Sequence, residues 1–175
     1  MLLIAAVIKL SDGGPVFFVQ RRVGLRGQTF RMLKFRSMVI HAERLRPKLQ
    51  LCNESNGPVF KMRLDPRVTA VGRFIRRYSL DELPQLLNVL RGNMSLVGPR
   101  PLILDEDQFI QAWGRTRLDL KPGVTGLWQV LGRSDIPFEE MVKLDYLYVT
   151  SWSFFTDMKL MLRTIPLVLG SRHAY

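Results

Sequence analysis

The sequence predicts an α+β domain that is mostly helical, with a small β-hairpin and amphipathic helices suited to a membrane interface. Two strand-like segments, residues 15–23 and 28–38, flank residues 24–27, whose two glycines indicate a hairpin turn. Downstream, leucines recur at i, i+3, i+4 and i+7 from Leu83, which is the spacing of an amphipathic helix. Residues 153–169 also combine an apolar face with cations, which favours a second such helix.

The composition is that of a folded chain with a strong positive charge. The 175 residues suit one domain, or one domain with an accessory element, and 47% of them are hydrophobic, as in globular proteins. Lys and Arg number 26 against 15 Asp and Glu, which gives a formal net charge of +11. Such an excess attracts polyanions, so nucleic acid, phosphorylated ligands and an anionic membrane surface are all partners to consider.

The N-terminal half is expected to contain an apolar start, the hairpin, two helices and a loop. The apolar run of residues 1–10 is too short to cross about 30 Å of hydrocarbon as a helix. It fits either the end of a longer apolar element or an ordinary buried segment. We expect a helix starting at Ser37, a loop at 53–67, which is rich in Asn, Gly and Pro, and a short basic helix within 67–77.

The C-terminal half is expected to alternate helices with irregular segments. The leucine-striped helix should end at Gly92, because glycine commonly follows the last helical residue. Glycines and prolines predict irregular structure at 95–104 and a long shaped loop at 121–135, and helices are expected at 105–118, 138–152 and from about Ser153, loosening at Pro166.

The last predicted helix has two possible environments. Its cations Lys159 and Arg163 interrupt the apolar run, so it does not resemble a membrane-spanning helix. A cationic helix with aromatic residues can lie in the plane of the lipid headgroups. It can equally be a core helix whose cations extend to solvent. The apolar residues concerned are Phe154, Phe155, Met158, Met161, Leu162 and Ile165.

The adjacent acidic pair Asp81 and Glu82 has a structural interpretation. Ser79 and Glu82 match the S-x-x-E pattern of a capping box, in which the serine caps a helix and the glutamate bonds back to it. Asp81 would then only favour the helix N-terminal dipole. Pro84 suits the first helical turn, where backbone N–H groups have no partner.

The surrounding arginines support a chemical interpretation of the same pair. A carboxylate beside arginines and a helix N-terminus should have a depressed pKa and stay ionised, which suits a nucleophile or metal ligand better than a general acid. Carboxylate oxygens suit Mg²⁺ and guanidinium groups suit phosphate oxygens, so the cluster describes a site for a metal-bound diphosphate. The arginines are Arg73, Arg76, Arg77, Arg91 and Arg100.

Other chemistries lack their usual motifs. The sequence contains neither the GxxxxGK[ST] phosphate loop nor the GxGxxG dinucleotide fingerprint. His41 and His173 are the only histidines and lie far apart in the sequence, which disfavours a histidine-based zinc site or a Ser-His triad. No nucleic-acid-binding motif is recognisable, although the charge keeps a basic nucleic-acid-binding module as an alternative.

Five motifs together resemble one family. The chain is similar to the bacterial sugar transferase family of monotopic polyprenyl-phosphate phosphoglycosyl transferases. NESNGPVFK and the closing SRHAY most resemble the branch that transfers hexose 1-phosphate, such as undecaprenyl-phosphate galactose or glucose phosphotransferases. The five motifs, in chain order, are KFRSM at 34–38, SLDELPQLLNVLRG at 79–92, MSLVGPRP at 94–101, KPGVTGLWQVLGR at 121–133, and residues 152–157.

The resemblance implies a reaction. The family's aspartate attacks the β-phosphate of a UDP-sugar, UMP leaves, and polyprenyl phosphate then takes the phosphosugar from the aspartate. The expected substrates are therefore a UDP-sugar and polyprenyl (undecaprenyl) phosphate, with Mg²⁺ as cofactor and no nucleic acid. The expected role is the first membrane step in the synthesis of exopolysaccharide, capsule, O-antigen or another glycoconjugate.

The resemblance also assigns roles to individual residues. Asp81 is the implied nucleophile, and Glu82 the implied Mg²⁺ ligand that supports it. The implied phosphate-binding residues are Arg76, Arg100 and Arg133, Asp157 is implied to support the metal or another polar group, and Lys34 and Arg36 are further candidates for phosphate binding.

The resemblance implies a location as well. Residues 1–10 match the end of an apolar element that re-enters the membrane, and residues 11–175 match the catalytic domain. We expect the protein on the cytoplasmic face of the bacterial inner membrane, against its anionic surface. Because little of the apolar element is present here, an inactive membrane-surface remnant is a further alternative.

Overall fold

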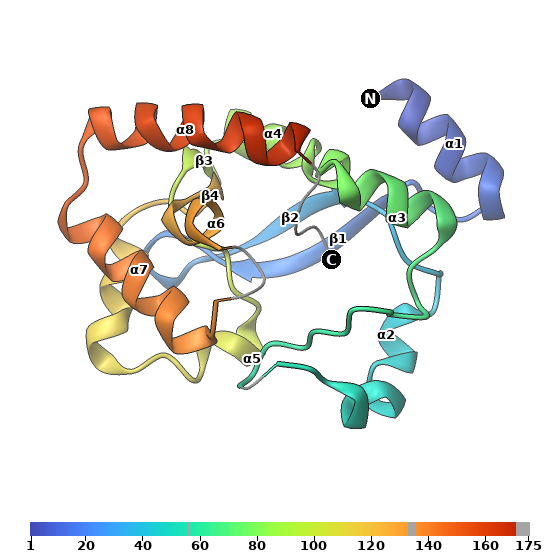
Figure 1. The fold of residues 1–175 in the computed structure, drawn as a ribbon, viewed down its shortest axis with the longest axis horizontal. Coiled ribbons are helices and arrows are strands. Elements are labelled where there is room, and N and C mark those ends of the chain that lie inside the picture. Colours follow the sequence, from blue (N-terminus) through green and yellow to red (C-terminus); the bar gives the residue numbers. More distant parts are fainter. Residues whose placement is uncertain (56, 133–135, 171–175) are drawn as a thin grey trace.

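The computed structural model describes residues 1–55, 57–132 and 136–170 of the chain. Helices predominate in this part, and two small sheets of two strands each lie among them (Figure 1). The prediction of a mostly helical α+β domain is therefore confirmed. The helices are α1 Leu2–Asp12, α2 Ala42–Leu45, α3 Ala70–Arg77, α4 Gln85–Leu90, α5 Leu104–Asp107, α6 Leu127–Leu131, α7 Phe138–Thr150 and α8 Phe154–Leu169, and the strands are β1 Phe17–Val23, β2 Thr29–Phe35, β3 Ser95–Val97 and β4 Gly123–Thr125.

The predicted hairpin is confirmed. Strands β1 and β2 pair antiparallel, from Phe17 opposite Phe35 to Val23 opposite Thr29. Gly27 in the turn has a φ of 78°, a left-handed conformation that glycine adopts without steric cost. The hairpin thus forms where the glycines of the turn indicated it.

The second sheet was not predicted. Strands β3 and β4 pair in parallel, although glycines and prolines in 95–104 and 121–135 predicted irregular structure there, and the second segment also contains helix α6. A side chain on Gly123 would collide with the backbone of Gly98. These glycines therefore permit two backbones to approach closely, a role that the sequence alone does not distinguish from helix or strand breaking.

Two predicted helices are shorter than expected. The helix expected from Ser37 is displaced because the backbone of Met38 pairs with Val68, and α2 begins only at Ala42. The helix expected over 105–118 is divided into α5 and a 3-10 segment at Ala112–Asp119. In the first case a tertiary pairing overrides local helix propensity.

The helices α3, α7 and α8 occur where they were expected. The Thr69 hydroxyl caps α3 by accepting a bond from the Gly72 N–H at 2.9 Å. Ser153 caps α8 in the same way, accepting from the Thr156 N–H at 3.1 Å. Helix α8 continues past Pro166 to Leu169 rather than loosening at the proline.

Three buried clusters hold these elements together. One joins α1, the hairpin and α3, and its buried members are Ile8, Phe35 and Ile75. A second packs α7 against Trp128 of α6. The third joins β3, α7 and α8 through Val97, Tyr148 and Leu160. The connection between α3 and α4 lies next to the first of these clusters, since Leu80 and Leu83 pack against it.

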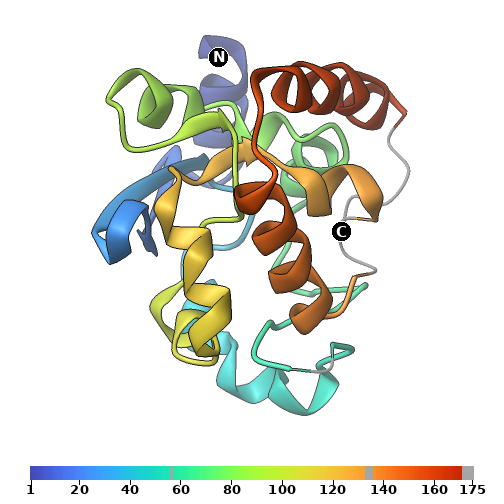
Figure 2. The ribbon, with the colours of Figure 1, turned by 90° about the vertical axis from the view of Figure 1, so that its left-hand side faces the viewer.

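One side of the molecule carries many exposed apolar side chains. Helices α1, α4 and α8 lie along the upper side in both views (Figures 1 and 2). In α8, Phe155 is 83% exposed, whereas Leu160 is buried. No helix among the described residues has the length and apolarity needed to cross a membrane. The exposed members are Leu2, Leu3, Val7 and Leu10 of α1, Leu86, Leu87 and Leu90 of α4, and Phe154, Phe155, Met158, Leu162 and Ile165 of α8, and we call this set the apolar face.

Candidate active site

Asp81 and Glu82 lie in a 3-10 turn, Leu80–Glu82, between α3 and α4. The predicted capping box is wrong, because the Ser79 side chain makes no capping bond and α4 begins only at Gln85. Ser79 has a φ of 54°, so its backbone is left-handed rather than extended as in a capping residue. The turn is instead closed by the backbone, with the Glu82 N–H donating to the Ser79 carbonyl at 3.2 Å.

Asp81 is buried, and this reverses the predicted direction of its pKa shift. Its residue surface is only 8% exposed, and burial raises the pKa of its carboxyl to about 6. Lys34 and Arg76 lower the pKa and Glu82 raises it, but loss of hydration is the largest effect. The expectation of a depressed pKa is therefore wrong. With a pKa about 6, roughly nine-tenths of the groups are still ionised at pH 7.

Lys34 is brought to the acidic pair by strand β2. Its ammonium lies 2.7 Å from the Glu82 carboxylate, and both side chains are partly exposed. Arg76, at the end of α3, also acts electrostatically on Asp81. The structure thus gathers four of the predicted site residues, two acidic and two basic, around one turn.

Arg36 has a different set of partners. Its guanidinium pairs with Asp12 at the end of α1 and donates to the Pro15 carbonyl. Arg36 is buried, and its pairing lowers the pKa of Asp12 to about 2. It links α1 to the hairpin, so we leave it out of the phosphate site proposed below.

Arg100 follows β3, and its guanidinium lies over the Trp128 ring, 4.7 Å from the ring centroid. Asp157 lies near the start of α8 and accepts bonds from the Tyr148 hydroxyl at 2.7 Å and the Trp152 indole N–H at 3.2 Å. These partners place it at the corner between α7 and α8. Arg133, the remaining predicted residue, lies outside the described residues, as do Asn56 and residues 171–175 of the two branch-specific motifs.

The carboxylates of the acidic pair are suitable ligands for a divalent cation that is also bound by substrate phosphates. Among the described residues, no three His, Cys, Asp or Glu side chains form a ready-made metal cluster. Mg²⁺ commonly binds through one or two carboxylates together with substrate phosphates, and it keeps several waters. The partly exposed oxygens of Glu82 suit this mode, with the buried Asp81 beside them.

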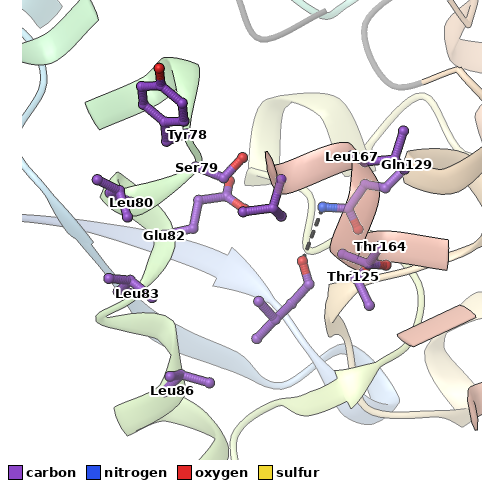
Figure 3. Close-up of a pocket in the computed structure, with 12 residues that line it drawn as sticks. Tyr78, Ser79, Leu80, Glu82, Leu83, Leu86, Thr125, Gln129, Thr164 and Leu167 are labelled. Carbon is purple, nitrogen blue, oxygen red and sulfur yellow. Dashed lines mark hydrogen bonds between the residues drawn. The ribbon is translucent and has the colours of Figure 1, made fainter. Parts of the chain in front are cut away.

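A cavity of about 170 Å³ opens beside Glu82, between helix α8 and the turn that carries Asp81 and Glu82, which we call the dyad (Figure 3). Its walls are largely apolar, with a few polar groups. Across from Glu82, the hydroxyls of Thr125 and Thr164 are 2.8 Å apart, and the Gln129 amide donates to the Val124 carbonyl at 3.0 Å. The lining includes Ser79, Leu80, Glu82, Leu83 and Leu86 on one side and Thr125, Gln129, Thr164 and Leu167 on the other.

The family is decided by comparison with known proteins. A family model described as bacterial sugar transferase matches residues 1–171. The chain belongs to this family. The resemblance found in the five motifs is thereby confirmed.

Curated relatives of this sugar transferase are similar over almost its whole length. The galactosyl transferase CpsE of Streptococcus agalactiae is 49% identical over 91% of the chain and 36% of the relative. The exopolysaccharide production protein ExoY of Sinorhizobium fredii is 44% identical over 99% of the chain and 79% of the relative. A UDP-glucose:undecaprenyl-phosphate glucose-1-phosphate transferase of Caulobacter vibrioides is 43% identical over 100% of the chain and 64% of the relative. The chain thus spans from about a third to about four-fifths of these relatives.

Arg22 is a charged residue near the site that the sequence did not single out. Its guanidinium donates to the Pro101 carbonyl at 3.0 Å and lies 3.8 Å from Glu106, and burial lowers its pKa to about 10. Arg100 and Glu82 are among the charged groups that act on that pKa, so Arg22 lies within electrostatic range of both. In sequence it is one of two arginines in a strand, and nothing there distinguishes it from a solvent-facing cation.

Proposed function

We propose that this sugar transferase moves a sugar 1-phosphate, most simply a hexose 1-phosphate, from a UDP-sugar to polyprenyl phosphate and releases UMP. The observation that carries the proposal is the buried Asp81 carboxylate next to Glu82, which pairs with Lys34 and itself lines a cavity. The printed names of the relatives, which include a glucose-1-phosphate transferase acting on undecaprenyl phosphate, support the substrate classes.

In the first step Asp81 is the nucleophile. One carboxylate oxygen attacks the β-phosphorus of the UDP-sugar, and the bond from that phosphorus to the bridging oxygen breaks. UMP leaves with the bond's electrons, and the sugar phosphate stays on Asp81 as an acyl phosphate. Burial favours this step because a poorly hydrated carboxylate has less water to shed before it attacks.

The basic groups compensate the negative charges that must meet in this step. Lys34 and Arg76 surround the dyad, and Arg100 presents a guanidinium supported by the Trp128 ring. Arg76 and Arg100 are suited to phosphate oxygens because guanidinium groups bind them in a fork. Glu82 would hold Mg²⁺, which when bound neutralises part of the diphosphate charge.

In the second step the acceptor removes the sugar phosphate. A phosphate oxygen of polyprenyl phosphate attacks the phosphorus carried by Asp81, and the carboxylate leaves with the electrons of the broken bond. The product is polyprenyl diphospho-sugar, and Asp81 returns to its ionised form. An aspartate that spends most of its time ionised near neutral pH suits both attack and departure.

The apolar face accounts for how a lipid acceptor would meet the site. Leu86 of this face also lines the cavity that Glu82 lines. We place the face on the cytoplasmic side of a bacterial inner membrane, where the net charge of +11 would favour anionic lipids. In this proposal the excess of Lys and Arg serves to attract the protein to anionic lipid headgroups.

The proposal is tested by following UMP. Purified protein is incubated with undecaprenyl phosphate, Mg²⁺ and either UDP-glucose or UDP-galactose. We expect UMP release that needs Mg²⁺ and is lost in Asp81→Asn, with Glu82→Gln requiring more Mg²⁺ for the same rate. Release that is as fast in Asp81→Asn as in the wild type would remove the nucleophile assignment, and no release from any UDP-sugar would favour an inactive remnant.

A further inference from the structure

The segment Gly98–Leu102 is bonded to the rest of the protein at every residue. It runs from the end of β3 to the start of α5 and contains Arg100. Its backbone makes three bonds of 2.9 Å to neighbouring strands: the Gly98 N–H to the Thr125 carbonyl, the Gly123 N–H to the Pro99 carbonyl, and the Val23 N–H to the Leu102 carbonyl.

Arg100 and Pro101, in the middle of the segment, are bonded instead by charged side chains. The Arg100 N–H donates to an Asp145 carboxylate oxygen at 3.3 Å, and Arg117 donates to the Arg100 carbonyl. Arg117 and Asp145 also pair with each other at 3.0 Å, and their side chains are 2% and 1% exposed. Arg22 continues the pattern by donating to the Pro101 carbonyl. One buried ion pair thus bonds both the N–H and the carbonyl of Arg100.

A buried ion pair is a weak means of raising the free energy of unfolding. Removing two charges from water is costly, and apolar residues of similar volume often serve stability as well or better. The raised pKa of Asp145, about 6, is a sign of that cost, since burial is its largest cause. What the pair does provide is a fixed position for both backbone groups of Arg100.

The Arg100 side chain is fixed from its other end. Its guanidinium lies over the ring of Trp128, which is itself buried in a cluster with Leu102 and Met141. Backbone and head group are therefore both held before any ligand arrives. A preorganised guanidinium loses less freedom when it binds phosphate oxygens.

We propose that Arg117 and Asp145 are positioning residues that hold Arg100 over Trp128, so that its guanidinium is ready to bind the diphosphate of the nucleotide-sugar donor. The inference rests on the proposed function, because it needs Arg100 to bind the donor. Neither residue touches the donor itself. Their effect is exerted through the Arg100 backbone.

The test replaces both members of the ion pair, so that neither is left as a lone buried charge. Arg117 also lies 3.9 Å from Asp107, which keeps its pairing with Arg115 in the variant. The double variant Arg117→Met with Asp145→Leu removes both anchors of Arg100 and fills the space with apolar atoms. Because the Arg100 N–H and carbonyl lose their partners, we expect a lower Tm, and the kinetics are measured well below it, where the variant is folded. The KM for the UDP-sugar should rise about tenfold, the size of losing one well-placed charged contact. The KM for polyprenyl phosphate should stay unchanged.

A matched control separates position from general stability. Arg67 and Asp65 form another buried ion pair, which has no bond to Gly98–Leu102. Asp65 also acts electrostatically on Arg76, so the same replacement there, Arg67→Met with Asp65→Leu, should raise the KM for the UDP-sugar by no more than about twofold, well below the effect of replacing Arg117 and Asp145. Arg117→Lys is the conservative second variant: it keeps the charge but cannot bond Asp145 and the Arg100 carbonyl as a guanidinium does, so it should raise the same KM.

The decisive comparison is made in an Arg100→Ala background. If Arg117 and Asp145 act through Arg100, replacing them there adds no further loss. A folded double variant with a wild-type KM for the UDP-sugar, or a further loss in the Arg100→Ala background, would overturn the inference. Asp81→Asn is measured alongside, because a loss of UMP release there supports the proposed function whatever the positioning variants do.

Discussion

The Lys34 ammonium lies 2.7 Å from the Glu82 carboxylate and so joins strand β2 to the turn that carries Asp81. It also acts on Asp81, since it is the largest of the influences that lower the pKa of that buried carboxyl. One lysine of the hairpin therefore pairs with Glu82 and favours the ionised form of Asp81.

Replacing Lys34 by Met should shift the pH dependence of the reaction. Loss of the cation raises the pKa of Asp81 further above its value of about 6, so less of the nucleophile is ionised at pH 6 to 7. The acidic limb of the rate of UMP release should move to higher pH, by roughly one unit. Lys34→Arg keeps the charge and should keep the limb in place, and an unmoved limb in Lys34→Met would contradict the assignment.

Asp81→Asn should stabilise the protein while abolishing activity. An aspartate whose folded-state pKa is raised destabilises the fold wherever it is ionised, so its contribution is most favourable below pH 3.8 and is lost as pH rises through about 6. The variant should gain on the order of 2–3 kcal/mol over the wild type at pH 8. The gain should shrink toward pH 4 in urea denaturation, and a gain that is independent of pH would refute this cause.

Asn88 should be essential for stability rather than chemistry. It is 1% exposed, accepts a bond from the Leu33 N–H at 3.0 Å and donates to the Arg31 carbonyl at 2.8 Å, so it fastens α4 to the backbone of β2. Asn88→Leu leaves two backbone groups unpaired and should cost about 2–4 kcal/mol. Urea denaturation measures this cost. The exposed Asn93, replaced by Ala, is the control and should change stability by less than about 0.5 kcal/mol.

The exposed aromatic pair of α8 should govern binding to vesicles. Phe154 and Phe155 are 65% and 83% exposed, so their replacement by Ser removes apolar area from the apolar face without opening the core. Binding to vesicles of anionic phospholipid should weaken about tenfold or more, and sedimentation measures it. Leu51, in the 3-10 helix Pro47–Cys52, and Leu64 are even more exposed but lie outside the apolar face, so Leu51→Ser with Leu64→Ser should leave binding unchanged. An equal loss of vesicle binding in both double variants would show that α8 has no specific role in that binding.

The elements that were predicted correctly are those that depend on neighbouring residues in the sequence. The glycines of the turn predicted the hairpin, and the apolar face interrupted by cations predicted α8. The parallel pair of β3 and β4 could not be predicted in this way. Each of those strands has only three residues, and Gly98 after β3 and Gly123 in β4 serve close approach between segments distant in the sequence.

The sequence predicted that Lys34 and Arg76 would accompany Asp81 and Glu82, as the structure has them, but it did not predict the electrostatics of Asp81. The arginines near Asp81 suggested a depressed pKa, whereas burial, which depends on tertiary packing, raises it. The same limit applies to Arg36, whose partner Asp12 lies 24 residues away, and to the pair of Arg117 and Asp145, 28 residues apart. No spacing rule connects residues at such distances, so only the structure identifies these pairs.

If Asp81 carries the sugar phosphate during the reaction, intact-protein mass spectrometry should detect the adduct. The protein is incubated with Mg²⁺ and a UDP-hexose without acceptor and quenched, its mass is measured, and it is digested. We expect an added hexose phosphate on the peptide that contains Asp81, one UMP for each adduct, and loss of the adduct on addition of polyprenyl phosphate. UMP release on acceptor addition with no adduct at any earlier time, or an adduct that persists in Asp81→Asn, would contradict this role of Asp81.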